Sequence, residues 1–240
     1  MNNAKENLGI VAKGVFKSIL GIDFIGRTAL EIHNEYESKQ VKRKIQRLEE
    51  FYHRLDEKLV EEEKYVNEEF VKKEDFLDVF EEATRYIVLE RLTTKRELFK
   101  NILANSIISS ACDYDKTERY FRILDNLSEI ELKVLAVLEN PEAYNKSHGM
   151  IIKDPINNYY QSSWGTYRSD GVLTQLLGIK IDEAIEAVAV LFSNGLIVDN
   201  LLERRLETNA NPVHVLDKLL TKRGRDFVKF LSLDDLSDSR

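Results

Sequence analysis

Two of the four histidines in this sequence have a carboxylate one helical turn away, the arrangement most able to hold a metal ion. His33 precedes Glu37 and His53 precedes Glu57 by four residues, so each pair shares one face of a helix. A metal site needs further ligands, and no cysteine or second histidine completes either set. We interpret both pairs as solvated helix faces and predict no metal site.

The remaining candidates for chemistry are serine hydroxyls and paired carboxylates. His148 could serve as a base for Ser162 or Ser163, but no G-x-S-x-G turn and no acid at a recognisable spacing accompanies them. Asp113 and Asp115 form a carboxylate pair, yet their place between two expected helices favours a cap or a turn. The sequence therefore predicts a protein that is not an enzyme and that uses no cofactor.

The composition indicates a folded, mostly helical protein. Of the 240 residues 43% are hydrophobic and 32% are charged, and only three are proline, so most of the chain can form helix without an interior breaker. Cys112 is the single cysteine and no leader peptide follows Met1, which favours a reducing, cytoplasmic setting. No window reaches about eighteen uninterrupted apolar residues, so we expect no membrane-spanning helix.

Charge is divided unevenly along the chain. Residues 1–47 hold nine Lys and Arg against five Asp and Glu, whereas residues 48–240 hold twenty-six against thirty-seven. This division predicts a basic N-terminal arm on an acidic body, which suits an anionic surface or the body itself as partner. It makes nucleic acid an unfavourable partner.

Residues 1–33 are expected to form an amphipathic N-terminal helix. One side of it is apolar and the other carries lysines. The side chains expected to contact a membrane or a partner are Leu8, Val11, Val15, Ile19, Ile22, Lys13 and Lys17. Four glycines between residues 9 and 26 each cost about 1 kcal/mol against alanine in a helix interior, so this helix needs a surface to dock on.

Two surfaces could fill that role. Residues 8–32 could pack against the rest of the protein or a twin subunit, with the glycines permitting close contact. They could instead lie in the plane of an anionic membrane at the inner face, helped by the basic run of residues 39–47. The sequence leaves both alternatives open.

Residues 34–127 are expected to form a helical, partly coiled domain. A charged helix over residues 34–64 carries an apolar heptad seam, formed by Val41, Ile45, Leu48, Tyr52, Leu55 and Leu59. Three further helices are expected over residues 74–92, 94–112 and 116–127. Their predicted core is Phe76, Leu77, Phe80, Ile87, Leu98, Phe99, Ile102, Leu103 and Ile107. The small residues Ala104 and Ser106 would let another helix approach closely.

Residues 128–231 are expected to form a winged helix-turn-helix, followed by a polar tail at 232–240. Ser128 and Glu131 form a capping box for a first helix that runs to Pro141. Residues 141–170 are too irregular for a helix. After them come a short helix, a turn at Gly178, a second helix that stops at Gly195, and wing strands at 196–198 and 219–221. The predicted fold class is thus mainly α: a helical bundle with a small β wing.

The charges of the second helix of this module favour protein contact over DNA contact. A helix that reads DNA presents basic or amide side chains, whereas this one presents Asp182, Glu183 and Glu186. The irregular stretch inside this module, residues 156–171, clusters aromatic residues that form either a partner surface or a small satellite core. These residues are Tyr159, Tyr160, Trp164 and Tyr167.

Four segments in order resemble the abortive-infection alpha family of mostly helical bacterial proteins. They are RELFKNILANSI (96–107), YFRILDNLSEIELKVL (120–135), LFSNGLI (191–197) and LTKRGRDFVKF (220–230). The resemblance implies a role in phage defence and brings no catalytic residues. We therefore expect a non-enzymatic defence protein that acts by protein association or homo-oligomerisation, at the membrane surface in one interpretation. The alternative is a winged-helix transcriptional regulator.

Overall fold

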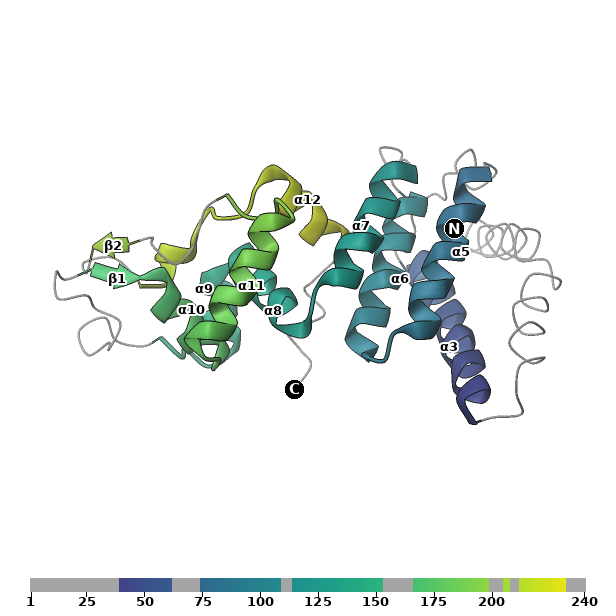
Figure 1. Ribbon diagram of the computed structural model, residues 1–240, viewed down its shortest axis with the longest axis horizontal. Coiled ribbons are helices and arrows are strands. Elements are labelled where there is room, and N and C mark those ends of the chain that lie inside the picture. The colour runs from purple at the N-terminus through teal and green to yellow at the C-terminus, as the bar shows by residue number, and fades with distance from the viewer. Residues whose placement is uncertain are drawn as a thin grey trace, which may run out of the picture. The chain divides into compact units, whose positions relative to one another are not determined.

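The computed structural model describes residues 39–61, 74–108, 114–152, 166–198, 205–207 and 212–231. The fold is mainly α, as predicted (Figure 1). Its elements in chain order are α3 (Lys39–Glu61), α5 (Glu74–Leu89), α6 (Thr93–Ile108), α7 (Tyr114–Asn126), α8 (Glu129–Glu139), α9 (Pro141–Ser147), β1 (Thr166–Arg168), α10 (Ser169–Leu177), α11 (Ile181–Ser193), β2 (Arg205–Glu207), the 3-10 helix η2 (Pro212–Leu216) and α12 (Lys222–Leu231). The chain divides into two compact units, residues 1–122 and 123–240, so the boundary falls within α7.

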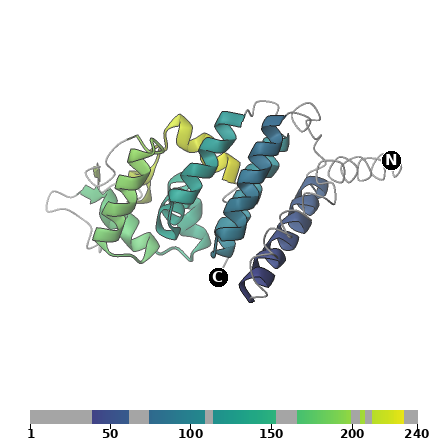
Figure 2. The ribbon, with the colours of Figure 1, turned by 45° about the vertical axis from the view of Figure 1, so that its right-hand side comes forward.

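In the first unit α3 packs against both α5 and α6, which also pack against each other (Figure 2). The seam of α3 supplies Leu48 and Leu55 to the core, and Phe51 beside the seam is buried as well. Tyr52 of α3 stacks on Phe80 of α5 with the ring centroids 5.8 Å apart. The heptad pattern therefore serves packing within this unit. The seam side chains of Val41, Ile45 and Leu59 lie outside the described residues.

The predicted core of this unit is confirmed for every member whose side chain is described. Only Leu77 falls outside that set, and the others are at most 2% exposed. Phe99 lies at the centre, stacked on Tyr86 at 5.1 Å and tilted against Phe121 at 6.0 Å. Ser106 meets α7 through a 3.0 Å hydrogen bond between its hydroxyl and that of Thr117. The small side chain at position 106 thus allows the close approach that the sequence indicates.

α8 is the first helix that lies wholly in the second unit, and its predicted capping box is present. The Ser128 hydroxyl accepts from the backbone N–H of Ile130, and the Glu131 carboxylate accepts from the backbone N–H of Ser128 at 2.5 Å. The expectation that residues 141–170 contain no helix is wrong, because Pro141–Ser147 form α9. Asn140 caps α9 by accepting from the Ala143 N–H at 3.0 Å. Pro141 takes the first helical position, where its missing N–H costs nothing.

α10 and α11 follow, joined by the expected turn at Gly178. α10 begins at Ser169, directly after β1, and β1 pairs antiparallel with β2, with Tyr167 opposite Leu206. This pair of strands was not predicted. The expected wing strands are not formed at 196–198 and 219–221, where the two segments share a single antiparallel bridge between Ile197 and Leu220 and a hydrogen bond from Val198 N–H to Leu219 O at 2.8 Å.

No helix among the described segments has both the length and the apolar content needed to cross a bilayer. The predicted N-terminal helix, residues 1–33, and the polar tail at 232–240 lie outside the described residues.

Candidate interaction surface

α11 is a helix of the second unit with one buried side and one exposed side. Its inner side consists of small and branched apolar residues that are buried, and the helix packs against α8 and α10. These inner residues are Ala184, Ala187, Val188 and Leu191. Because this side is fixed, the direction of every other α11 side chain is fixed as well.

Next to its buried side, α11 carries large apolar side chains that are partly exposed to solvent. Ile181 is 43% exposed, Ile185 is 41% exposed and Phe192 is 53% exposed. At 100° per residue these three positions fall within about 40° of arc, which makes them one ridge along the helix. Large exposed apolar groups that align in this way mark contact sites more often than scattered ones do.

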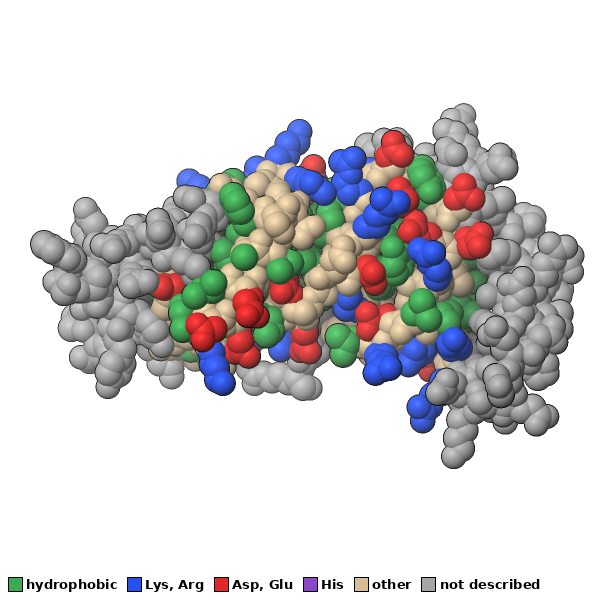
Figure 3. All heavy atoms as spheres, viewed as in Figure 1, with side chains coloured by type: hydrophobic (Ala, Val, Ile, Leu, Met, Phe, Trp, Pro, Cys, Tyr) green, Lys and Arg blue, Asp and Glu red, His purple; other side chains and the backbone are tan. Residues whose placement is uncertain are grey.

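Acidic side chains line one flank of this ridge. Asp182 and Glu186 are exposed and lie one turn apart, about 100° and 140° around the helix from Ile181. Glu183 has a structural task, because its carboxylate accepts from the backbone N–H of Lys180 at 2.8 Å and so caps the helix. Figure 3 shows hydrophobic side chains along α11, with acidic ones gathered toward its lower end. The α11 face is defined here as Ile181, Asp182, Ile185, Glu186 and Phe192.

The end of α11 is held by a Schellman motif. Gly195 has φ +67°, its N–H donates to Phe192 O at 2.8 Å, and the N–H of Leu196 donates to Leu191 O at 3.0 Å. The hydroxyl of Thr221 donates to Gly195 O at 2.7 Å and accepts from the N–H of Gly224 at 2.8 Å. One threonine therefore joins the end of α11 to the start of α12.

Gly224 is required where α12 crosses this corner. A Cβ at this position would lie 2.0 Å from Leu196 O, far inside van der Waals contact. The segments LFSNGLI and LTKRGRDFVKF are thus neighbours in space: their glycines and threonine form one corner that positions the α11 face.

Basic residues occupy the other side of this corner. Lys222 and Arg223 are exposed in the first turn of α12, while Arg225 donates to Leu220 O at 2.7 Å. Two further arginines, Arg204 and Arg205, stand earlier in the same segment of the sequence. Arg205 lies in β2, and Arg204 lies outside the described residues.

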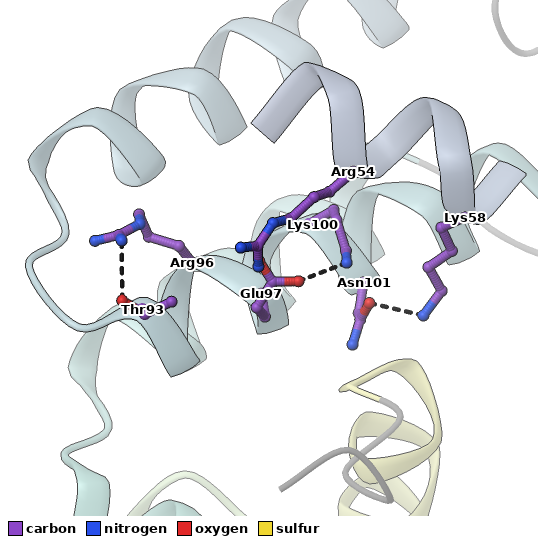
Figure 4. A network of polar contacts seen from close by, with 7 residues as sticks. All are labelled: Arg54, Lys58, Thr93, Arg96, Glu97, Lys100 and Asn101. Carbon is purple, nitrogen blue, oxygen red and sulfur yellow. Dashed lines mark hydrogen bonds and ion pairs between the residues drawn. The ribbon is translucent and has the colours of Figure 1, made fainter. Parts of the chain in front are cut away.

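A second candidate is a shallow groove in the first unit, between α3 and the start of α6. Its charged lining consists of Arg47, Arg54, Arg96, Lys100, Glu50 and Glu97. Arg54 and Lys100 both contact the Glu97 carboxylate at 2.5 Å, and Lys58 reaches Asn101 at 2.7 Å alongside them (Figure 4).

The two remaining arginines of the groove cap the end of α5. Arg47 donates to Val88 O at 2.9 Å, and Arg96 donates to the carbonyls of Glu90 and Arg91 at 3.2 and 3.0 Å. Burial and, after it, the like charge of Arg47 lower the pKa of Arg96. Because the cations of this groove already satisfy carboxylates and helix-end carbonyls, we assign them to the packing of α3, α5 and α6.

Four of the side chains singled out for acid–base chemistry or metal binding lie in the described residues, namely His53, Glu57, His148 and Asp115. His53 and Glu57 form an exposed pair with 3.2 Å between Nδ1 and Oε1, as a solvated helix face predicts. His148 Nδ1 lies 2.8 Å from Tyr144 O and its ring stacks on that of Tyr144 at 3.9 Å. Asp115 is exposed in the first turn of α7. Across the described residues, no three of His, Cys, Asp and Glu gather as a metal-ligand set.

Several predicted residues lie outside the described segments. They are His33, Glu37, Asp113, Ser162 and Ser163, the N-terminal contact set Leu8, Val11, Val15, Ile19, Ile22, Lys13 and Lys17, and the aromatic residues Tyr159, Tyr160 and Trp164. Tyr167 is placed in β1.

The apolar ridge of α11 was not foreseen. Spacings of four and seven residues between Ile181, Ile185 and Phe192 show that they share a face, but Val188 lies on the same arc and is buried. Only the packing of neighbouring helices against α11 distinguishes the buried Val188 from the exposed residues of the ridge.

Comparison with known proteins gives no relative for this chain: no family model matches it, and neither a curated protein nor a solved structure is significantly similar to it.

Proposed function

We propose that this chain is a non-enzymatic bacterial phage-defence protein of the abortive-infection kind, which acts by protein association in the cytoplasm or at the inner membrane face. The observation that carries the association part is the α11 face, an exposed apolar ridge with acids along one flank. The phage-defence part rests on the four sequence segments, in their order along the chain, that resemble the abortive-infection alpha family.

The second unit acts in this proposal as a winged-helix module with α8, α10 and α11 as its three helices. Three features support that interpretation. α10 and α11 are joined by a short turn, the strand β1 before α10 pairs with β2 from the segment after α11, and Ile197 bridges to Leu220. In a module of this kind α11 takes the place of the recognition helix.

Protein is a better partner for this helix than DNA. Asp182 and Glu186 would face the phosphates of a duplex, whose negative charge repels them, and the exposed Ile185 and Phe192 have no counterpart in a phosphate backbone. An apolar ridge with a charged edge is instead the usual composition of a protein contact.

Residues 8–32 would provide the regulated part of the mechanism. Held against a protein surface at rest, they would be released to lipid or a partner when the trigger arrives. The glycines and the basic charge of this segment motivate the proposal. If the full chain and a form lacking residues 1–32 fail alike to float with anionic liposomes, the lipid part of the proposal is wrong.

The experiment that tests the function is phage challenge of a bacterium expressing the chain. We expect the wild type to protect the culture, and the double variant Ile185→Ser with Phe192→Ser to lose protection at equal expression. Leu89→Ser is the matched control, because Leu89 is 62% exposed but lies on α5. Protection by the double variant equal to that of the wild type would refute association through α11.

The alternative is a winged-helix transcriptional regulator. The exposed Lys222 and Arg223 beside the end of α11 favour it. It predicts tight, salt-sensitive binding of a random duplex in an electrophoretic shift at low salt, lost on replacing both cations by glutamate. Absence of such a shift would leave protein association as the function.

A further inference from the structure

The α11 face has a shape that limits the kind of partner it fits. Its apolar ridge runs from Ile181 to Phe192, which is eleven residues or about 16 Å of helix. Its three apolar side chains are between 41% and 53% exposed and stand in a single row along the helix. A ridge of this kind packs best between the side-chain rows of another helix.

The charges limit the partner further. Asp182 and Glu186 lie on one flank of the ridge, while the opposite flank turns inward through the buried Val188 and Leu191. A partner therefore meets negative charge along a single edge, at two positions one helical turn apart. Cations four residues apart on a partner helix would have the matching spacing.

From these features we propose that the α11 face docks an amphipathic helix that carries lysine or arginine four residues apart beside its apolar stripe. The inference rests on the proposed function, since it names the partner chemistry of that same surface. Attraction between the acids of α11 and the cations of the partner helix orients the partner and speeds encounter. Burial of Ile185 and Phe192 supplies most of the affinity.

A second copy of the chain fits the face less well. In a two-fold antiparallel pair of α11 helices, both acidic flanks fall on the same edge of the interface. Glu186 lies near the middle of the helix and would face its own symmetry mate. Like charges placed in this way oppose association.

The chain's own sequence supplies a probe with the required pattern. Residues 8–32 place Lys13 and Lys17 four residues apart, and the apolar Phe16 and Leu20 lie about 60° around the helix from them. The experiment measures binding of a labelled synthetic peptide of residues 8–32 to the full chain by fluorescence anisotropy at low salt. A peptide with Lys13→Glu and Lys17→Glu serves as its charge-reversed partner.

We expect the charge-reversed peptide to bind the wild-type chain about tenfold more weakly than the native peptide does. The variant Asp182→Lys with Glu186→Lys should lose about as much affinity for the native peptide and should recover it for the reversed peptide. Asp78→Lys with Glu81→Lys makes the same change of net charge at exposed positions on α5, so it should leave affinity unchanged. Glu186→Lys alone, away from the helix end, provides a second variant if the double variant is poorly folded.

Three outcomes would overturn the proposal. They are equal loss in the α11 and α5 variants, failure of the reversed peptide to recover affinity, and self-association of the full chain in sedimentation velocity that Phe192→Ser abolishes. The purified protein is measured without phage, so the two proposals fail separately. Peptide binding without protection refutes the defence function alone, and protection that depends on α11 without peptide binding refutes the partner chemistry alone.

Discussion

The corner between α11 and α12 makes a sharp prediction for Gly224→Ala. In most helices this change stabilises, by about 1 kcal/mol, because alanine has the better helix propensity. Here the new Cβ would lie 2.0 Å from Leu196 O and 2.9 Å from Leu196 C. That carbonyl cannot turn away, because it accepts from the Thr221 N–H at 2.9 Å and belongs to a fully buried residue.

The expected cost follows from these contacts. The backbone of α12 or of Leu196 must move by more than about 1 Å, and overpacking of this kind costs about 3 kcal/mol at the upper end of its usual range. Subtracting the gain in propensity leaves a net loss of about 2 kcal/mol in the free energy of unfolding. For a unit of this size the midpoint of thermal unfolding should fall by about 8 °C.

The assay is thermal unfolding followed by tryptophan fluorescence. Trp164 is the single tryptophan and lies in the sequence range of the second unit. Lys229→Ala, at an exposed position of α12, is the control and should leave the midpoint within about 1 °C. A Gly224→Ala midpoint equal to or above that of the wild type would show that α12 does not approach Leu196 as described.

Three further predictions test other parts of the fold. Thr221→Val removes the cap of α12 and its bond to Gly195 O, so the second unit should lose about 1–2 kcal/mol in urea unfolding; an unchanged midpoint would contradict the corner. Phe99→Ala empties the centre of the first unit and should cost about 3–5 kcal/mol, measured by circular dichroism, whereas a loss under about 1 kcal/mol would place Phe99 outside the core. Burial acts to raise the pKa of Glu90, but the hydrogen bond from the Leu92 N–H and the charge of Lys95 outweigh burial and lower this pKa below 4.5. The stability that ionised Glu90 contributes is therefore present above pH 4.5 and is lost as the pH falls further. In Glu90→Gln the free energy of unfolding should fall less steeply with decreasing pH than in the wild type. An identical pH dependence would refute the ion pair between Glu90 and Lys95.

Local signals in the sequence predicted most of the helices and their ends. The capping box at Ser128 and the stop at Gly195 depend on residues within one or two turns, and both are present. The apolar period of α5 and α6 likewise identified the core, since burial of one helix face is a local pattern.

The elements that the sequence did not predict depend on interactions that a local sequence pattern does not reveal. Pro141 was interpreted as the end of a helix, yet it also begins α9, and only the Asn140 cap distinguishes the two cases. β1 is three residues long and pairs with β2 almost forty residues later, so no neighbouring residue indicates it.

The candidate site shows the same division between local and distant information. The acids of α11 could be predicted to face outward from charge alone. The exposure of Ile185 and Phe192 could not, because an apolar residue on a helix is usually interpreted as core. Which side of α11 is covered depends on how α8 and α10 pack against it.

The most direct test of the central claim, that α11 is a docking face for a basic amphipathic helix, is amide hydrogen exchange of the full chain with and without the peptide of residues 8–32. Added peptide should slow exchange within α11 and leave α3 and α5 unchanged, and Asp182→Lys with Glu186→Lys should remove the effect. Slowed exchange at the charged groove of α3 and α6, or at α12 in place of α11, would contradict it.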